Sequence, residues 1–213
     1  MLPITTIISR VRENINDTTK TGYTEKEIIA SINSAMRFLR RTIKTYRPMM
    51  LADVCEGTLA FDKDSQMFED KVTLEKLPTA FLDIRINNVR IEAVNIAFIR
   101  DINARGVPNR YYQIGMGTIK FYPMPNKEVN YRILYVPDFI ELKKDDTTPI
   151  PNDFDDFIIE YTVLRLAMGD EFNMSQEAEL MSNIHEQIKQ NLLCGSNESN
   201  YINGYFDCVV RGW

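Results

Sequence analysis

The sequence is poor in the residues that form cross-links, metal centres and most nucleophilic sites. Its 213 residues include three cysteines, Cys55, Cys194 and Cys208, and one histidine, His185. An odd number of widely spaced cysteines without a CxxC pair argues against a disulfide framework and against structural zinc. A single histidine leaves few arrangements for nucleophilic catalysis. We therefore expect no cofactor and no metal, with His185 on a helix surface or boundary.

Long hydrophobic runs and catalytic motifs are also missing. No apolar stretch approaches the roughly 20 residues that span a bilayer, and the start, MLPITTIISR, lacks the features of a signal peptide. We expect a chain made and kept in a cytosol, without a membrane partner. No GxSxG, P-loop, GxGxxG or HExxH motif occurs, so nothing indicates an enzyme. Carboxylate pairs that meet only in space, as in glycosidases, stay open.

The composition predicts a folded protein that is not a general nucleic-acid coat. Hydrophobic residues make up 44% and charged residues 26% of the chain, which argues against disorder. The formal net charge of −5 disfavours non-specific nucleic-acid binding, because that affinity comes from clustered Lys and Arg. The length fits one domain with extensions.

Helical periodicity marks the first 50 residues. Apolar residues at i, i+3, i+4, i+7 and i+11 predict a helix that ends near the turn 17–22: Ile4, Ile7, Ile8, Val11 and Ile15. Thr24 and Glu27 form a capping box, and Tyr23 with Ile28 a hydrophobic staple, at the start of a second helix of about six turns that ends before Pro48. The short connection predicts an N-terminal helical hairpin over residues 1–50.

Alternating and β-branched segments dominate residues 51–140 and predict a mostly antiparallel β-rich region. The alternating segments are 54–61, 71–77, 81–99 and 111–122, and residues 129–136 predict a strand that Pro137 ends. Gly115 to Gly117 predict a tight hairpin turn. Asn103 to Arg110 are expected to form an exposed loop.

The next segment predicts a second helical hairpin, over residues 141–195, that packs on the first. Pro149 and Pro151 exclude a helix before residue 152, so Asn152 or Asp153 is the expected N-cap of a helix that Gly169 ends. A further helix carries apolar residues at helical spacing and closes at Gly195: Ala178, Met181, Ile184, Ile188 and Leu192. Residues 196–213 form a C-terminal extension.

Short motifs in both helical parts resemble the head-to-tail adaptor, or connector, proteins of tailed bacteriophages. One motif runs from Asp17 through Tyr23, Thr24 and Glu27 to Arg47 and Pro48. The other comprises Tyr135, Pro137, Asp145, Asp146, Pro149, Pro151, Asp153, Phe154 and Asp156. The resemblance implies a structural virion protein at the head-tail junction, assembled in the host cytoplasm. It implies a ring, commonly of twelve copies, that binds the portal protein, extends the DNA channel for genome ejection and holds tail proteins.

One candidate interaction surface is basic. Arg37, Arg40, Arg41, Lys44 and Arg47, called the basic stripe below, fall within an arc of about 120° at 100° per residue. Three interpretations stay open: a surface that faces double-stranded DNA without sequence specificity, a contact with a neighbouring subunit or partner, or a solvated face with partners in the same chain.

A second candidate is acidic: Asp145, Asp146, Asp153, Asp155 and Asp156. Oxygen-rich loops hold calcium, but the EF-hand pattern is missing, and helix capping and loop solubility explain most of these carboxylates. They are also candidates for the second face of a subunit contact.

The third candidate is the aromatic chain end, with Tyr201, Ile202, Tyr205, Phe206 and Trp213. Because free termini are usually polar, we expect it to dock on its own domain, a neighbouring subunit or the portal. The sequence thus predicts an α+β adaptor: a bundle of two α-hairpins with a β-rich insertion and a docking tail. The alternatives are another neck or tail ring component, a DNA-binding helical module, and a hydrolase with an unrecognised carboxylate site.

Overall fold

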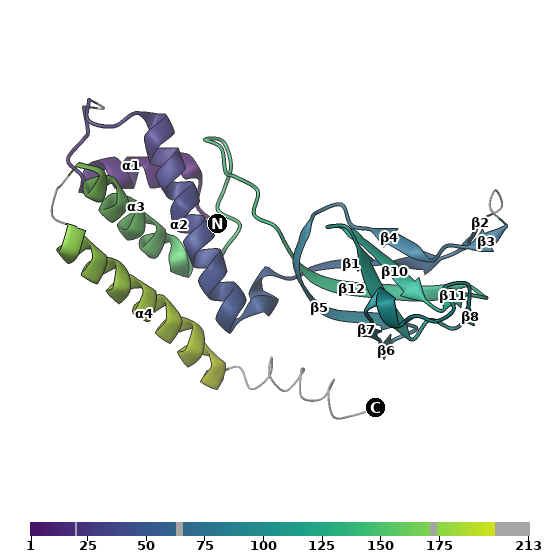
Figure 1. Cartoon of the computed structure of the whole chain (residues 1–213). Helices are drawn as coiled ribbons and strands as arrows, with labels where there is room; N and C mark the ends of the chain where they lie inside the picture. Colours follow the sequence, from purple (N-terminus) through teal and green to yellow (C-terminus); the bar gives the residue numbers. More distant parts are fainter. Residues whose placement is uncertain (20, 63–65, 171–173, 199–213) are drawn as a thin grey trace. The chain divides into compact units, whose positions relative to one another are not determined.

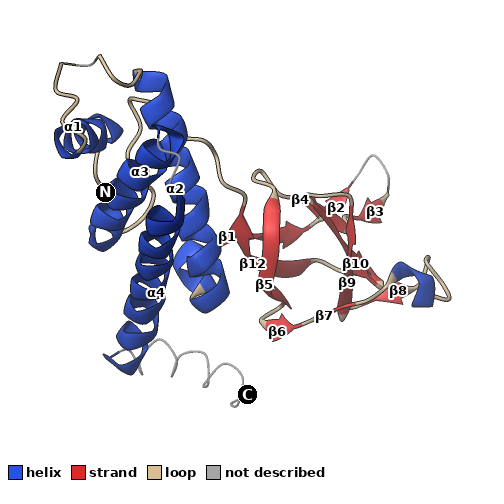
Figure 2. Cartoon of the chain, turned by 60° about the vertical axis from the view of Figure 1, so that its left-hand side comes forward, coloured by secondary structure: helices blue, strands red, loops and turns tan. Residues whose placement is uncertain are grey.

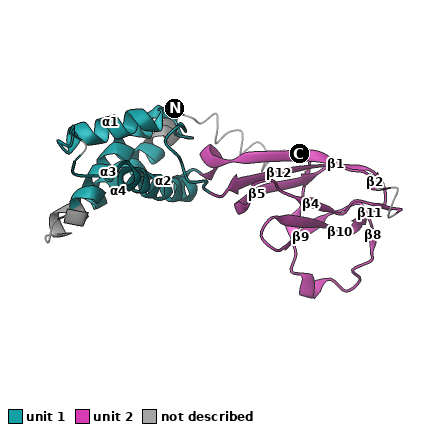
Figure 3. Cartoon of the chain, turned by 90° about the horizontal axis from the view of Figure 1, so that it is seen from above, with its two compact units in different colours: residues 1–47, 139–213 teal, residues 48–138 magenta. Residues whose placement is uncertain are grey.

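The chain is an α+β protein that folds into two compact units (Figure 3). A computed structural model describes residues 1–19, 21–62, 66–170 and 174–198. Unit 1 comprises residues 1–47 and 139–213, and unit 2 comprises residues 48–138. In the described residues unit 1 carries four α-helices, whereas unit 2 consists mainly of strands (Figure 2). None of these helices is both long and apolar enough to cross a membrane.

The four helices of unit 1 pack into one bundle. Its helices are α1 (Ile4–Asn14), α2 (Glu25–Tyr46), α3 (Asp155–Asp170) and α4 (Met174–Glu198), and the 3₁₀ turn η3 (Asn152–Phe154) precedes α3. Helix α3 contacts α1, α2 and α4 (Figure 1). The predicted apolar faces of α1 and α2 are confirmed, because Ile4, Ile7, Val11, Ile28, Ile32 and Ile43 are fully buried.

A buried carboxylate organises the turn between α1 and α2. One oxygen of Asp17 accepts the backbone N–H groups of Thr21 and Gly22, both at 2.9 Å. The other accepts the Tyr23 N–H at 3.2 Å and forms an ion pair with Arg12. Arg12 also donates to the Tyr23 carbonyl at 3.1 Å. The backbone of this turn is thereby tied to the end of α1, which sets where α2 begins.

The predicted capping box at the start of α2 is confirmed. Thr24 Oγ1 accepts from the Glu27 N–H at 3.3 Å, and Glu27 Oε2 accepts from the Thr24 N–H at 2.7 Å. These bonds satisfy donors that the first helical turn leaves open. The helix has 22 residues, which matches the predicted six turns.

Three predicted helix ends in the second half of unit 1 are wrong. Pro151, not Asn152 or Asp153, precedes the 3₁₀ turn, and no side chain caps it. Helix α3 continues through Gly169 to Asp170, and α4 continues through Gly195 to Glu198. A glycine inside a helix costs only about 1 kcal/mol relative to alanine, which tertiary packing readily offsets.

Unit 2 contains two four-stranded sheets. The first has the order β1 (Asp53–Leu59), β12 (Val129–Pro137), β5 (Pro78–Ile86) and β6 (Val89–Arg90). The second has the order β4 (Lys71–Thr73), β10 (Thr118–Tyr122), β9 (Arg110–Ile114) and β7 (Glu92–Ala93). Two short pairs join β2 (Phe61–Asp62) to β3 (Met67–Phe68) and β8 (Arg105–Gly106) to β11 (Met124–Pro125). The 3₁₀ turns are η1 (Pro48–Leu51) and η2 (Ile96–Phe98).

Most strand pairs of unit 2 are antiparallel, as predicted. The exceptions among the described strands are β7 with β9 and β8 with β11, which are parallel. The predicted tight turn is confirmed, since β9 and β10 pair across Gly115, whose φ is +65°. The prediction of an exposed loop at 103–110 is partly wrong, because β8 lies within it and Pro108 is buried.

The core of unit 2 lies on the inward faces of its sheets. Val129, Ile133 and Tyr135 of β12 are buried, as the alternation predicts, whereas Asn130 and Arg132 are exposed. A register shift after Leu134 also buries Val136. Opposite β12, Gly57 of β1 lies against the Tyr131 ring, and a Cβ there would come within 2.5 Å of the Tyr131 hydroxyl. A side chain at position 57 would therefore force the Tyr131 ring to move.

The Asp17 turn predicts an acid-sensitive contribution to stability. The N–H of Gly22, together with those of Tyr23 and Thr21 and the Arg12 charge, lowers the pKa of Asp17 against the opposing effect of burial. A lowered pKa stabilises the fold above the unfolded-state pKa of about 3.9, and the effect is lost as pH falls through the folded-state pKa. Asp17→Asn should lower the urea midpoint at pH 7. The difference in midpoint between the variant and the wild type should become smaller below about pH 4. The exposed Asp145→Asn is the control, and equal losses in both variants would contradict the role of Asp17.

The contact between Gly57 and Tyr131 predicts a strongly non-additive pair of substitutions. Gly57→Ala should cost roughly 1–3 kcal/mol, because the new methyl group displaces the ring. In a Tyr131→Ala background the same change should cost nearly nothing, since the colliding atoms are gone. Denaturant unfolding of the wild type, both single variants and the double variant measures the coupling. Additive losses would show that strand pairing, and not the ring, excludes a side chain at position 57.

Candidate functional site

Four members of the basic stripe, Arg37, Arg40, Arg41 and Lys44, lie on the C-terminal half of α2, and Arg47 is its C-cap with non-helical backbone angles. Arg37 and Arg41 are exposed, whereas Arg40, Lys44 and Arg47 are half-buried. The five residues span 37–47, or about 15 Å at 1.5 Å per residue. The stripe is continuous along the helix, but its members differ in their surroundings.

The first two arginines hold the segment that enters unit 1 from β12. Their guanidinium carbons lie 6.0 Å (Arg37) and 5.8 Å (Arg40) from the centre of the Phe139 ring. Arg37 also forms an ion pair with Glu141. Exposed ion pairs contribute about 0–1 kcal/mol, and exposed cation–π contacts about 0.5–1 kcal/mol. This part of the stripe therefore has partners in the same chain, which is one of the three interpretations of the sequence.

Arg41 is the exposed member of the stripe whose charge stays unneutralised. Among the described residues its guanidinium has no ion pair or hydrogen bond, and only its backbone carbonyl is engaged, by the Thr45 hydroxyl at 3.0 Å. The Arg41 guanidinium therefore stays hydrated until a partner binds it. Arg41 is consequently the residue at which a contact with another molecule is best tested.

The structure separates the acidic candidates into two places. Asp145 and Asp146 lie in a tight turn, where Asp146 accepts the Lys143 N–H at 2.7 Å and its carbonyl accepts the Ile4 N–H at 3.0 Å. The preceding Lys144 forms an ion pair with Glu25 at 2.8 Å, so this turn lies beside the start of α2.

The remaining three carboxylates surround the start of α3. Asp153 is exposed, and Asp156 is exposed with Arg10 at 3.9 Å. Asp155 is only 4% exposed and accepts a long hydrogen bond, 3.4 Å, from the Thr148 hydroxyl. Burial raises the pKa of Asp155, and the amino terminus partly offsets that effect. Asp155 is thus a structural residue, while Asp153 and Asp156 present charge to solvent.

Sequence reasoning missed the partners that hold the 139–142 segment. Arg37 and Glu141 are 104 residues apart, and the Asn33 amide exchanges two hydrogen bonds with the Leu142 backbone, at 3.0 and 2.8 Å. No local pattern links positions so distant in the chain, so only a tertiary arrangement could reveal them.

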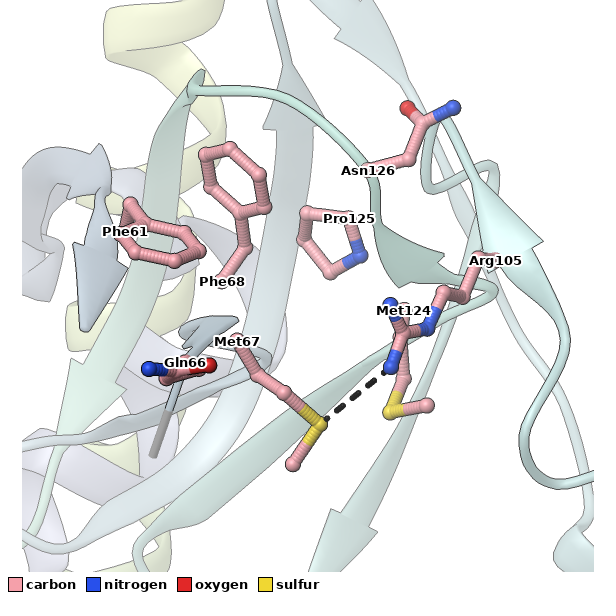
Figure 4. A pocket seen from close by; sticks show the side chains of 8 residues that line it. All are labelled: Phe61, Gln66, Met67, Phe68, Arg105, Met124, Pro125 and Asn126. Atoms are coloured by element: carbon pink, nitrogen blue, oxygen red, sulfur yellow. Dashed lines mark hydrogen bonds between the residues drawn. The ribbon is translucent and has the colours of Figure 1, made fainter. Parts of the chain in front are cut away.

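Unit 2 carries a small pocket of about 110 Å³ where its two short strand pairs meet (Figure 4). Apolar side chains from three of these strands line it: Phe61, Met67, Phe68, Met124 and Pro125. Gln66, Arg105 and Asn126 complete the lining. The Phe61 and Phe68 rings meet edge to face at 5.2 Å, and Arg105 donates to the Met67 sulfur at 3.6 Å. The pocket is too small for a drug-sized ligand but fits one side chain of a partner.

The other candidate residues have structural surroundings or lie outside the described residues. His185 is exposed on α4 with its ring against Phe38, 5.2 Å away, which confirms the predicted surface position. Burial raises the pKa of the half-buried Cys55 thiol, which disfavours a thiolate nucleophile. Within the described ranges no three His, Cys, Asp or Glu side chains are close enough to hold a metal. The aromatic residues of the tail, Tyr201, Ile202, Tyr205, Phe206 and Trp213, lie outside the described residues.

Comparison with known proteins identifies a family. The model of the family described as SU10 adaptor protein matches residues 3–195, which include every described element except the last turn of α4. Among curated proteins none matches the chain. Because the matched region covers most of the sequence and both units, the chain belongs to the SU10 adaptor protein family of phage head-to-tail adaptors.

Proposed function

We propose that this chain is a structural virion protein that forms a ring beneath the portal of a phage head. In this role it extends the DNA channel and holds tail proteins. The observation that carries the proposal is the family match across residues 3–195. The resemblance implies twelve copies. Double-stranded DNA passes through such a ring without sequence-specific contacts.

The distribution of charge in unit 1 supports a ring contact. A closed ring is built from heterologous contacts, so each subunit needs two different, complementary faces. The basic stripe lies at the C-terminal end of α2. Asp145 lies near the start of α2, because the neighbouring Lys144 forms an ion pair with Glu25, the first residue of the helix. Glu25 and Arg41 are separated by about 24 Å along the helix axis at 1.5 Å per residue. Exposed charges of opposite sign therefore lie at the two ends of one helix.

Unit 2 suits the part of a platform for tail proteins. Its segment around η2 and β8 exposes four large apolar side chains: Ile96, Phe98, Ile102 and Val107. Phe98 is 78% exposed. Together with the pocket beside Arg105, this clustering is typical of a surface that a protein partner covers. We assign portal or neighbour contacts to unit 1 and its tail, and tail-protein contacts to unit 2.

The alternative of a DNA-binding helical module has weaker support. The net charge is −5, and Arg37 and Arg40 are already engaged with Glu141 and Phe139. Few cations remain to release counterions from a duplex, and the salt dependence of binding scales with that number. The basic stripe is better suited to an acidic protein face.

The ring proposal predicts that Arg41→Glu impairs assembly without unfolding the chain. Arg41 is exposed and unpaired among the described residues, so its reversal changes no internal contact. At each subunit contact it places like charges together, which should weaken association by at least about tenfold, or 1.4 kcal/mol. Mixing the chain with the portal ring encoded beside it, followed by mass measurement and electron microscopy, detects the loss of a saturable ring.

The matched control is Lys127→Glu, which makes the same change of charge at an exposed position of unit 2, outside both proposed ring-contact faces of unit 1. It should assemble like wild type, and circular dichroism should show both variants folded. Normal rings from Arg41→Glu would remove the basic stripe from the contact. No association of the wild-type chain with the portal at any salt concentration would contradict the adaptor role itself.

A further inference from the structure

Helix α3 is hydrophobic on more sides than its neighbours cover. Between residues 157 and 167 only Glu160, Thr162 and Arg165 lack a hydrophobic side chain. A helix that is apolar almost all round belongs in the centre of a bundle, enclosed on every side. Three helices, α1, α2 and α4, contact α3. Helix α2 also contacts both α1 and α4, whereas no comparable contact joins α1 to α4 in the described part of unit 1.

The open side of the bundle is a groove. It has a volume of about 370 Å³ and lies along α3 between the end of α1 and the first half of α4. Half of its lining residues are apolar, Val163, Leu164, Leu180 and Ile184, and half are polar, Asn14, Glu160, Asn183 and Gln187. The four polar residues are exposed, and Leu180 is 48% exposed. Apolar side chains beside exposed polar ones are the usual lining of a site that receives a hydrophobic segment.

We propose that this groove binds the C-terminal segment of the same chain, residues 199–213. This segment has the composition that the groove requires, because large apolar side chains make up about half of it: Tyr201, Ile202, Tyr205, Phe206, Val209, Val210 and Trp213. The contact concerns the chain alone, so it does not depend on the adaptor role.

The length of the segment fits a return along α4. Ile184 precedes Glu198, the last residue of α4, by fourteen positions, or about 21 Å of helix. An extended chain covers about 3.3 Å per residue, so about seven residues bridge that distance. Tyr205 and Phe206 are the seventh and eighth residues after Glu198 and therefore reach the groove beside Ile184.

Connectivity favours the chain's own segment over that of a second copy. A segment tethered by a few residues has an effective concentration in the millimolar range, far above that of a second molecule in dilute solution. In the free chain the intramolecular contact is therefore favoured over a contact with a second copy.

A tryptophan placed at position 206 tests the contact directly. Trp213 is the only tryptophan of the sequence, so Phe206→Trp combined with Trp213→Phe yields a single reporter inside the proposed contact. In the full chain its emission should be blue-shifted relative to a 199–213 peptide with the same two changes. The shift should not change on dilution. Leu180→Glu, at a half-exposed groove position, should move the emission to that of the peptide.

Leu193→Glu is the matched control, because Leu193 is 44% exposed on the same helix but does not line the groove. It should retain the blue shift, and circular dichroism should show both variants folded. Three results would overturn the proposal: peptide-like emission of the full chain at every concentration, a blue shift that disappears on dilution and so reports a second copy, or a blue shift that Leu180→Glu leaves intact.

Discussion

The arrangement of unit 1 depends on the Asp17 carboxylate. It accepts three backbone N–H groups of the turn and the Arg12 guanidinium, close to the point where α2 begins. A buried charge is stable only when its oxygens are fully paired, so the turn has one conformation that satisfies it. Tyr23, whose backbone takes part on both sides of this network, also places its hydroxyl 3.4 Å from the Leu166 carbonyl of α3. The turn that Asp17 organises is thus linked both to the start of α2 and to α3.

The elements that could be predicted from sequence are those whose information is local. The apolar period of α1 and α2, the capping box at Thr24 and the alternation of β12 each depend on neighbours a few residues away, and all three are confirmed. The errors in unit 1 concern glycines and caps. Gly169 and Gly195 lie inside helices because the packing of α3 and α4 outweighs a local cost of about 1 kcal/mol. At Asn152 the side chain accepts from the amino terminus, 151 residues away, and is not used as a cap.

The candidate site illustrates the same limit. The angular count treated all five cations as helical, whereas α2 carries only Arg37, Arg40, Arg41 and Lys44, and Arg47 is its C-cap. The count also contains no information about what lies opposite these side chains. Phe139 and Glu141 come from the far side of the β-rich unit in sequence and engage two of the five. The five acidic residues are close in sequence but are divided between a turn beside α2 and the start of α3. One of them, Asp155, is buried. Sequence proximity of charges is therefore a poor guide to a shared surface, whereas exposure without a partner, as at Arg41, is a usable one.

The open side of the bundle connects folding with assembly. Three helices do not enclose a fourth that is apolar almost all round, so unit 1 leaves Val163 and Leu164 only half-buried in the lining of a groove. A chain that had to be stable alone would be expected to place polar residues there. In the contact proposed above, residues 199–213 cover this surface in the free chain, and a partner that bound the groove would have to displace them. The same apolar residues would then serve both contacts, without a separate patch exposed to solvent.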